Sequence, residues 1–212
     1  MNDPRRYEQV GISFTQHDAH ICVWAPFATS VALHTYSPER YILLEQDRYG
    51  YWCSDTQDII PGQHYHFHVD GVDLPDPASR SQPDGVHGIS AAVDLEYAWT
   101  DHGFEAPSLR ELIIYELHVG TFTRQGDFEG VLSKLPYLQS LGINAIEIMP
   151  IAQFPGARNW GYDGVYPFAV QESYGGARAF QHLVDACHAQ GIAVIVDVVY
   201  NHVGPEGNHF PA

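Results

Sequence analysis

The sequence predicts two successive folds, a small antiparallel β-sandwich over residues 1–105 and a parallel β-sheet covered by helices over residues 106–212. The first part consists of short β-rich runs that recur at roughly 10-residue spacing between turn signals, as in small sandwiches. The second part has three strongly apolar runs, separated by two segments with apolar residues at spacings of three and four. An order of β-α-β-α-β with continuous apolar strands indicates a parallel sheet with helices on its faces.

Strands of the first part are marked by alternation and by the turn residues around them. In the clearest run Tyr65, Phe67 and Val69 share one face, and the histidines between them are expected on a solvated face without a metal ion. Three prolines then break the pattern between residues 74 and 90, which predicts a long surface connection. The predicted strands include residues 20–25, 31–36, 51–53 and 64–69.

Helices of the second part carry their own stop signals. Pro136 lies inside the first predicted helix and should kink or restart it, and Gly142 and Gly191 end the two helices. A doubly wound sheet and a (β/α)8 barrel both begin with this order of elements, although the absence of a Gly-rich phosphate-binding fingerprint after the first strand weakens the doubly wound option. The predicted strands cover residues 112–119, 143–149 and 192–199, and the predicted helices cover residues 128–141 and 177–190.

Composition narrows the classes of partner. A formal net charge of −16 repels phosphate backbones, so nucleic acid is not expected as a partner. The N-terminus lacks the apolar segment of a secretory signal, and no apolar run approaches the roughly 20 residues that span a bilayer, so the cytoplasm is predicted and a membrane is not. The three cysteines, Cys22, Cys53 and Cys187, are far apart and are predicted to be buried free thiols rather than a disulfide or zinc framework. The oligomeric state is left open.

Polar side chains gather where the last predicted strand ends. Asp197, Asn201 and His202 follow a run of apolar residues, so they would stand at the carboxyl end of a buried strand. In a barrel that end carries the active site. A single aspartate there is often a cap, but an acid, an amide and an imidazole together are harder to explain as packing.

The segment that contains these three residues resembles part of a known protein family. Residues 197–202, Asp-Val-Val-Tyr-Asn-His, resemble the first signature region of glycoside hydrolase family 13, the α-amylase superfamily, and three further segments resemble its first strand, its second strand and the loop that follows. The resemblance covers about residues 111–210 and implies a (β/α)8 barrel, of which this chain holds the first three strands and two helices. The sandwich resembles the starch-linked modules of carbohydrate-binding-module family 48. The three further segments are residues 117–122, 146–150 and 159–163.

Within that family, residues 160–166, 200–208 and 75–88 are most similar to the malto-oligosyltrehalose trehalohydrolases. The resemblance implies roles for single residues. Tyr162 would stack on a glucose ring, and Asp163 and His202 would hydrogen-bond the same substrate. Asp197 would orient an arginine outside this chain, and Asn201 would support the site. No metal ligand is assigned, because no carboxylate-rich loop accompanies Asn201.

The resemblance implies a retaining hydrolysis of an α-1,4 bond next to a terminal trehalose, with malto-oligosyltrehalose or another α-glucan as substrate and no cofactor. That chemistry needs two carboxylates, which the family places after its fourth and fifth strands, so no catalytic residue is assigned in this chain. A debranching enzyme of isoamylase type and a branching enzyme remain alternatives, as do a non-catalytic glucan-binding module and an inert product. Trp24 and Trp52 could be sugar platforms in the sandwich, but core packing is expected for both.

Overall fold

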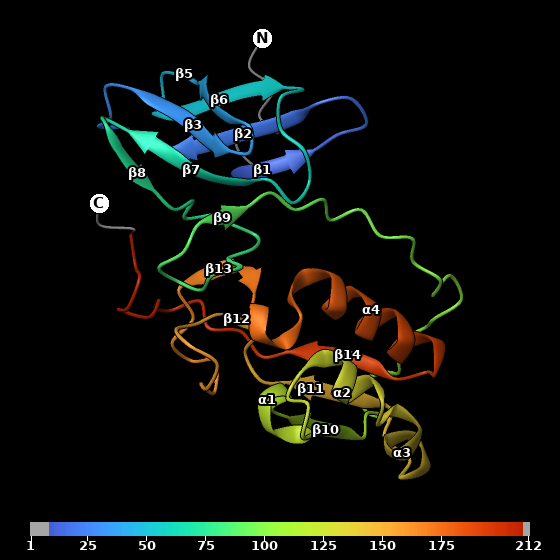
Figure 1. Cartoon of the computed structure of the whole chain (residues 1–212). Coiled ribbons are helices and arrows are strands. Elements are labelled where there is room, and N and C mark those ends of the chain that lie inside the picture. Colours follow the sequence, from blue (N-terminus) through green and yellow to red (C-terminus); the bar gives the residue numbers. More distant parts are fainter. Residues whose placement is uncertain (1–8, 210–212) are drawn as a thin grey trace. The chain divides into compact units, whose positions relative to one another are not determined.

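The computed structural model describes residues 9–209, which divide into two compact units (Figure 1). Of the described residues, 9–94 and 207–209 belong to the first unit and 95–206 belong to the second. Among residues 9–209, the regular elements of the first unit are β-strands, whereas the helices and a parallel sheet belong to the second.

Two antiparallel sheets build the first unit. One sheet has the strand order β1-β2-β6-β5, and the other has the order β4-β3-β7-β8, with β9 pairing on β7. The strands of the first sheet are β1 (Gly11–Phe14), β2 (Ala19–Trp24), β6 (Tyr51–Thr56) and β5 (Glu45–Gln46). Those of the second are β4 (Glu39–Leu43), β3 (Val31–Tyr36), β7 (His64–Val69), β8 (Val72–Leu74) and β9 (Ser90–Ala91).

A single apolar core joins these two sheets. Ile21 of β2, Leu33 of β3 and Phe67 of β7 are fully buried in it. Because side chains alternate along a strand, neighbouring residues on β2 and β6 face in opposite directions. Trp52 therefore lies in the core, as predicted, whereas Trp24 is 58% exposed and the packing prediction is wrong for it. The Trp24 indole donates a 3.1 Å hydrogen bond to the backbone oxygen of Tyr49.

The segment between residues 74 and 90 corrects another prediction. It is not a surface connection, because Asp76, Ser79 and Gln82 are completely buried in it. Asp76 accepts a 2.6 Å hydrogen bond from the Tyr65 hydroxyl and a 2.8 Å bond from the backbone N–H of Ala78. The polar residues that suggested a loop thus form an internal hydrogen-bonding network, which allows polar groups to be buried.

The second unit contains a three-stranded parallel sheet with the order β10-β11-β14. Its strands pair in sequence order, as predicted, and an antiparallel pair, β12 and β13, lies between β11 and α4 in the chain. The strands are β10 (Ile114–Leu117), β11 (Ala145–Ile148), β14 (Ala193–Val196), β12 (Ala152–Gln153) and β13 (Tyr166–Val170). The helices are α1 (Val119–Phe122), α2 (Phe128–Leu132), α3 (Leu135–Ser140), α4 (Gly176–Ala189) and the 3-10 helix η2 (Glu172–Tyr174).

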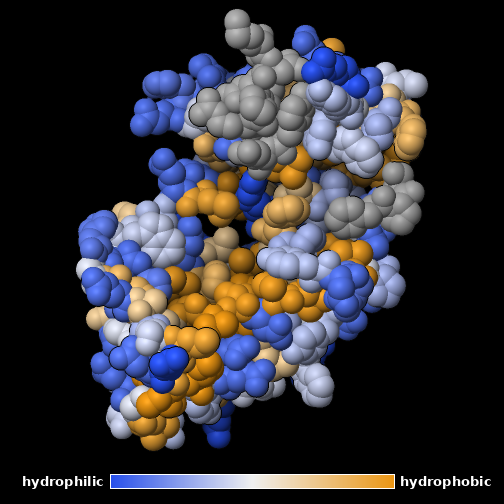
Figure 2. Space-filling view, turned by 180° about the vertical axis from the view of Figure 1, so that it is seen from behind, coloured by the Kyte–Doolittle hydropathy of each residue, from blue (hydrophilic) through white to orange (hydrophobic). Residues whose placement is uncertain are grey.

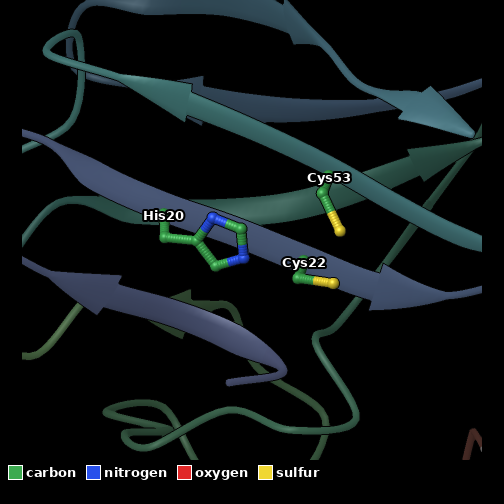
Figure 3. A group of neighbouring side chains, drawn as sticks. All are labelled: His20, Cys22 and Cys53. Atoms are coloured by element: carbon green, nitrogen blue, oxygen red, sulfur yellow. The ribbon is translucent and has the colours of Figure 1, made fainter. Parts of the chain in front are cut away.

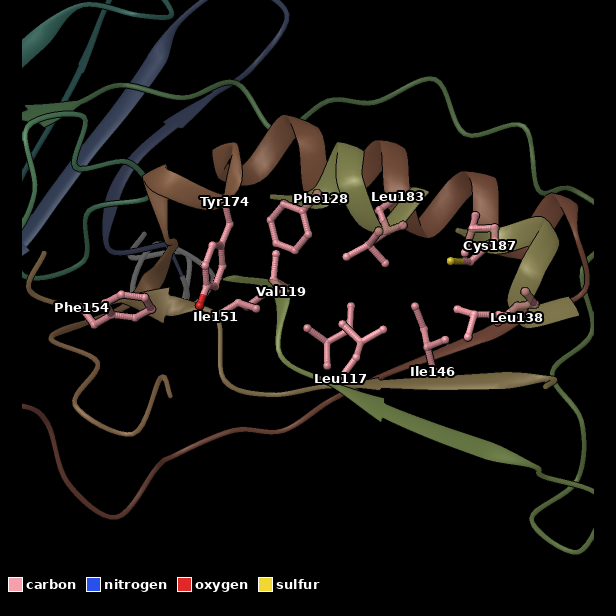
Figure 4. Close-up of a cluster of buried hydrophobic side chains, with 14 residues drawn as sticks. Leu117, Val119, Phe128, Leu138, Ile146, Ile151, Phe154, Tyr174, Leu183 and Cys187 are labelled. Carbon is pink, nitrogen blue, oxygen red and sulfur yellow. The ribbon is translucent and has the colours of Figure 1, made fainter. Parts of the chain in front are cut away.

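Helices α2, α3 and α4 cover one face of this sheet (Figure 4). The sheet contributes Leu117, Ile146 and Ile148 to the core, and the alternate residues Glu116 and Glu147 lie on the opposite face. None of the helices in the described part of the chain is long and apolar enough to cross a membrane. The helices contribute Phe128, Val131, Leu135, Leu138, Leu183 and Cys187 to the core.

The first predicted helix is two short helices. Asp127 caps the start of α2, because its side chain accepts a 2.8 Å hydrogen bond from the N–H of Gly130. Pro136 stands in the first turn of α3, where the missing proline N–H costs no helical hydrogen bond, so the helix restarts there. Gly142 and Gly191 follow α3 and α4 with positive φ angles of 79° and 73°, as their predicted role as stops requires.

Candidate functional site

The five residues that the sequence singles out come from two segments of the second unit. Asp197 directly follows β14, and Asn201 and His202 lie in the segment after it. Tyr162 and Asp163 lie in the loop between β12 and β13. Direct hydrogen bonds join these two segments and bring Tyr162 together with Asp197 and His202.

The first of these bonds joins two side chains. The Tyr162 hydroxyl donates to a carboxylate oxygen of Asp197 at 2.9 Å. This hydrogen bond is the main cause of a raised pKa at Tyr162, and desolvation and the negative charges of Asp197, Glu116 and Glu147 raise that pKa further. The phenol is therefore a hydrogen-bond donor at neutral pH, with its hydroxyl directed to Asp197.

The second bond joins the His202 ring to the same loop. Its Nε2 lies 2.9 Å from the backbone oxygen of Tyr162 and must donate, because a carbonyl oxygen only accepts. Its Nδ1 lies 3.0 Å from the end of the Asn201 amide, and because Nε2 carries the proton of the neutral ring, Nδ1 accepts a hydrogen bond there when the amide presents its NH2 group. A backbone bond of 2.9 Å from Gly204 N–H to the Gly164 oxygen adds a further link, so the segment after β14 is tied to the loop at several points.

Asp163 is held from within its own loop. Asn159 donates from its side-chain nitrogen to a carboxylate oxygen of Asp163 at 2.9 Å, and its side-chain oxygen accepts from the N–H of Gly161 at 2.8 Å. The backbone oxygen of Asn159 accepts a 2.7 Å hydrogen bond from the His118 ring, which comes from the end of β10. Two segments of the second unit, this loop and the end of β10, thus determine where Asp163 lies.

Two glycines allow this close packing. Gly161 has a φ of 93°, and a Cβ there would lie 2.0 Å from the backbone oxygen of Pro150. A Cβ at Gly204 would lie 2.3 Å from the backbone oxygen of Asp163. No side chain fits at either position without moving backbone, so both glycines are required by the loop that carries Tyr162 and Asp163.

Sequence reasoning missed two acids near this site. Glu116 and Glu147 are direct partners in the parallel register of β10 and β11, on the sheet face away from the helices. Val196 packs on the helical side, so the next residue, Asp197, faces the same side of the sheet as the two glutamates, and their charges contribute to the raised pKa of Tyr162. A charged residue inside each of two apolar strands was the available signal, since such a residue must face away from the buried helical side.

The exposed surface of this site suits a neutral polyhydroxylated ligand. Tyr162 is 38% exposed, and the aromatic rings of Trp160 and Tyr200 are largely open to solvent. Flat aromatic rings pack on the apolar faces of sugars, while carboxylates, amides and imidazoles exchange hydrogen bonds with hydroxyls. A pocket of about 190 Å³ adjoins the site, lined among others by Pro150, Phe168, Phe180, Asp197, Val198 and His202.

A group of side chains that could hold a metal ion lies in the first unit and not among these site residues. Among residues 9–209, His20, Cys22 and Cys53 of the first unit are the one group of three or more such side chains whose ligand atoms converge. All three cysteines are buried, as predicted, and none of them is joined in a disulfide. Their separation in the sequence is misleading, however, because Cys22 and Cys53 are direct partners on adjacent strands.

Comparison with known proteins relates most of the chain to trehalohydrolases and to an alpha amylase. The family description "Alpha amylase, catalytic domain" matches residues 74–212. Malto-oligosyltrehalose trehalohydrolase of Saccharolobus solfataricus is 50% identical over 188 residues, which cover 88% of this chain and 33% of that protein. The trehalohydrolase of Arthrobacter ramosus is 44% identical over 196 residues, which cover 89% of this chain and 34% of that protein.

A solved structure agrees with these relatives. The putative alpha amylase of Salmonella typhimurium superimposes with a TM-score of 0.89 at 38% sequence identity, covering 96% of this chain and 35% of that one. The chain spans about a third of the length of the curated relatives that it matches. Because the family description matches well over half of the sequence, the chain belongs to the alpha-amylase catalytic-domain family.

Proposed function

We propose that this chain provides one wall of the active site of an enzyme that hydrolyses the α-1,4 bond next to the terminal trehalose of malto-oligosyltrehalose. The observation that carries the proposal is the linkage of Tyr162, Asp197 and His202 at the carboxyl end of β14. It fixes an aromatic ring among hydrogen-bonding groups, as a subsite for glucose requires. The identity of 44–50% to trehalohydrolases favours trehalose release over other reactions on glucans.

Tyr162 is the proposed platform for the glucose unit beside the scissile bond. Its hydroxyl is committed to Asp197, so the ring is held in one orientation before the sugar arrives. Asp163, which Asn159 positions, would accept hydrogen bonds from sugar hydroxyls. His202 donates a hydrogen bond from Nε2 to the Tyr162 backbone oxygen. A sugar hydroxyl would accept a hydrogen bond from this nitrogen only by replacing that bond.

Asp197 and Asn201 are proposed as supporting residues. One carboxylate oxygen of Asp197 accepts from Tyr162, and the other makes no hydrogen bond among the described residues, so it is open to a donor such as an arginine. Asn201 contacts the Nδ1 side of the His202 ring and would fix its orientation. Neither residue would react with the sugar.

We extend the proposal to the fold. The parallel strands β10, β11 and β14, with Asp197 at their carboxyl end, would be the first three strands of a (β/α)8 barrel. The two-sheet unit would be a sandwich of the type found in carbohydrate-binding-module family 48. Trp24 is the side chain of that unit best placed to test sugar binding, because it is exposed whereas Trp52 is buried.

A chimeric enzyme tests the proposed activity. In it, this chain replaces the matching third of the Saccharolobus solfataricus trehalohydrolase, and the products from maltotriosyltrehalose, pullulan and amylose are compared. Release of trehalose from the first substrate is expected. Cleavage of pullulan would indicate a debranching enzyme, and new branches in amylose would indicate a branching enzyme.

Glucan binding by the chain itself tests the alternative that the chain is a non-catalytic glucan-binding module. Titration with maltotriosyltrehalose, followed through the fluorescence of the exposed Trp160, should give saturable binding that Tyr162→Ala removes. Binding that survives Tyr162→Ala but is lost in Trp24→Ala would instead assign glucan binding to the first unit. If, in addition, the folded chimera had no activity, binding that depends on Trp24 and not on Tyr162 would contradict the proposed active site.

A further inference from the structure

The first unit contains a buried group of side chains that the proposed active site does not use. His20 and Cys22 lie on β2, and Cys53 lies on β6, on the sheet face opposite the shared apolar core (Figure 3). All three are buried, and His20 is only 8% exposed. Nothing in the proposed sugar chemistry explains two thiols and an imidazole gathered inside a sheet.

Strand register produces this arrangement. Cys22 and Cys53 are direct partners in the antiparallel pairing of β2 and β6, and His20 is the partner of Asp55. Residues two apart on a strand share a face, so the imidazole lies beside both sulfur atoms. The ligand atoms of His20, Cys22 and Cys53 all lie within 4.8 Å of one another.

The two nitrogens of His20 have different surroundings. Nδ1 lies 2.6 Å from a carboxylate oxygen of Asp55, which can only accept, so Nδ1 carries the proton. In the neutral ring Nε2 then has a free lone pair. This atom is buried and makes no hydrogen bond of ordinary geometry, and the ring edge that carries it points toward the two cysteines (Figure 3). The Cys53 thiol acts on His20 as a hydrogen-bonding group. A thiol is only a weak hydrogen-bond partner, so a metal ion would satisfy the buried nitrogen better than this contact does.

We propose that His20, Cys22 and Cys53 bind a zinc ion, with Asp55 as the residue that positions His20. Two thiolates and one imidazole are ligands that zinc prefers, and a carboxylate on the far nitrogen is the usual partner of a zinc-binding histidine. Tetrahedral zinc holds such atoms about 3.5–3.8 Å apart, so atoms that lie within 4.8 Å of one another need to approach by at most about 1.3 Å. A small ligand such as water would complete the coordination.

Proton balance follows from this chemistry. Each thiol loses its proton as its sulfur binds the metal, so one zinc ion releases two protons from Cys22 and Cys53 when both start as thiols. His20 contributes no proton while its ring is neutral. In acid, a proton at Nε2 competes with the metal, so binding should weaken as the pH falls. The bound ion would join β2 to β6 in addition to their backbone ladder.

The test uses the full 212-residue chain without an affinity tag, reduced and freed of metal. Zinc is titrated in competition with a chromophoric chelator, and cobalt(II) is titrated separately as a spectroscopic probe. One zinc ion per chain is expected, and cobalt should give the intense near-ultraviolet band of thiolate coordination and the visible bands of a tetrahedral site. Cys22→Ser and Cys53→Ser should each weaken zinc binding at least about 100-fold and change the cobalt spectrum.

Two further variants sharpen the test. Cys187→Ser removes the third buried thiol, which lies in the second unit, and should leave affinity and spectrum unchanged. Asp55→Asn keeps all three ligands and should weaken zinc binding about 10- to 100-fold at unchanged stoichiometry. It also keeps the proposal testable if a serine variant fails to fold, which circular dichroism reveals.

Three results would overturn the proposal. One is the absence of zinc binding by a folded chain in which both thiols are reduced. Another is a cobalt spectrum that is the same in Cys22→Ser as in the wild type, which would assign binding to other histidines. The third is a disulfide between Cys22 and Cys53 in the purified protein, detected by mass spectrometry, because it would leave no thiolate for a metal.

Discussion

The hydroxyl of Tyr162 and the carboxylate of Asp197 are 35 residues apart in the sequence and 2.9 Å apart in the structure. One stands in the loop between β12 and β13, and the other follows β14. The bond links the loop to the end of the sheet. It also makes the orientation of the Tyr162 ring depend on the Asp197 carboxylate. Two further bonds from the segment after β14 to the same loop reinforce this dependence.

Removal of the acid should change the titration of the phenol. Asp197→Asn eliminates the negative charge and replaces the carboxylate acceptor of Tyr162 with a weaker, neutral amide oxygen, so the pKa of Tyr162 should fall toward the ordinary value of about 10. Carbon-13 NMR of tyrosine ring carbons measures it, with the resonance assigned through Tyr162→Phe. Asp185→Asn is the control, since that carboxylate binds Thr100 instead. Identical Tyr162 titrations in wild type and Asp197→Asn would show that the bond does not form in solution.

Truncation of His202 should reduce catalysis by the chimeric enzyme. His202→Ala loses the bond to the Tyr162 backbone and the proposed donor to the sugar, so kcat/KM for maltotriosyltrehalose should fall roughly 10- to 200-fold, about 1 to 3 kcal/mol. The matched control is His182→Gln, which changes an exposed histidine of α4. If His202→Ala stays within about twofold of the unmodified chimera, the active-site face has been placed wrongly.

Asp76 should make the stability of the first unit depend on pH. Complete burial raises the pKa of its carboxyl to about 6, so between about pH 4 and 6 the folded state binds more protons here than the unfolded state. This group therefore lowers the free energy of unfolding as the pH rises through that range. Asp76→Asn cannot ionise, and its free energy of unfolding relative to wild type should rise by up to about 3 kcal/mol from pH 4 to pH 7.

Urea unfolding at both pH values measures this difference. Tryptophan fluorescence reports on the first unit when Trp99 and Trp160 are replaced by phenylalanine, because Trp24 and Trp52 then remain. The control is Asp84→Asn, an exposed acid of the same segment. A difference between Asp76→Asn and wild type that does not change with pH would mean that Asp76 does not titrate in this range.

Strands and helices that have a clear periodicity in the sequence were predicted correctly. Alternation placed Tyr65 and Phe67 on the buried face of β7, and spacings of three and four placed a helix over residues 177–190, where α4 spans Gly176–Ala189. Both signals reflect a periodicity that the backbone geometry itself imposes. The roles of the site residues in the second unit were predicted from the resemblance rather than from periodicity.

Contacts between distant segments were not predictable in this way. Cys22 and Cys53 seemed far apart because strand register is not visible in either strand alone, and the register is what makes them partners. The buried segment around Asp76 looked like a loop because its polar groups bind each other and Tyr65, and no single residue shows this. Glu116 and Glu147 could have been recognised, since a charge inside an apolar strand marks the face away from the core.

Gly161 should be less tolerant of substitution than a glycine in open space. In Gly161→Ala the new Cβ meets the backbone oxygen of Pro150 at 2.0 Å and the residue must keep a φ of 93°, so the loop has to move. Gly191→Ala is the matched control, because its φ is 73° and nothing lies within 4 Å of its Cβ. Only the backbone cost, about 1 kcal/mol, applies there.

Thermal unfolding and glucan titration measure the two effects. Gly161→Ala should lose at least about 2 kcal/mol more stability than Gly191→Ala, since backbone must shift, and should also weaken binding of maltotriosyltrehalose by displacing the neighbouring Tyr162. Equal effects of the two substitutions on stability and binding would show that the loop is not packed against Pro150 as described.

The edges of the parallel sheet make the second unit vulnerable. Among the described residues, β10 and β14 each pair with β11 only, so each leaves one side of its backbone ladder without a strand. Ile113, Ile114 and Val198 are about half exposed beside these edges, and Figure 2 shows apolar side chains gathered on the surface of this unit. Unpaired strand edges with apolar neighbours favour pairing with another chain and local opening.

The two units of the 212-residue chain should therefore differ in resistance to proteolysis. Each half-exposed isoleucine or valine forgoes about half of the 1.5–3 kcal/mol that complete burial contributes, so a few of them together offset a substantial part of a typical folding free energy of 5–15 kcal/mol. The first unit has an apolar core shared by two sheets and should survive longer. Limited proteolysis with mass spectrometry should give early cuts within residues 95–206, and light scattering should detect dimers or aggregates. The Ile114→Lys variant, which places a charge beside the open edge of β10, should reduce association without protecting the unit from cleavage. A monomer that resists protease over its whole length would show that this sheet is stable with open edges.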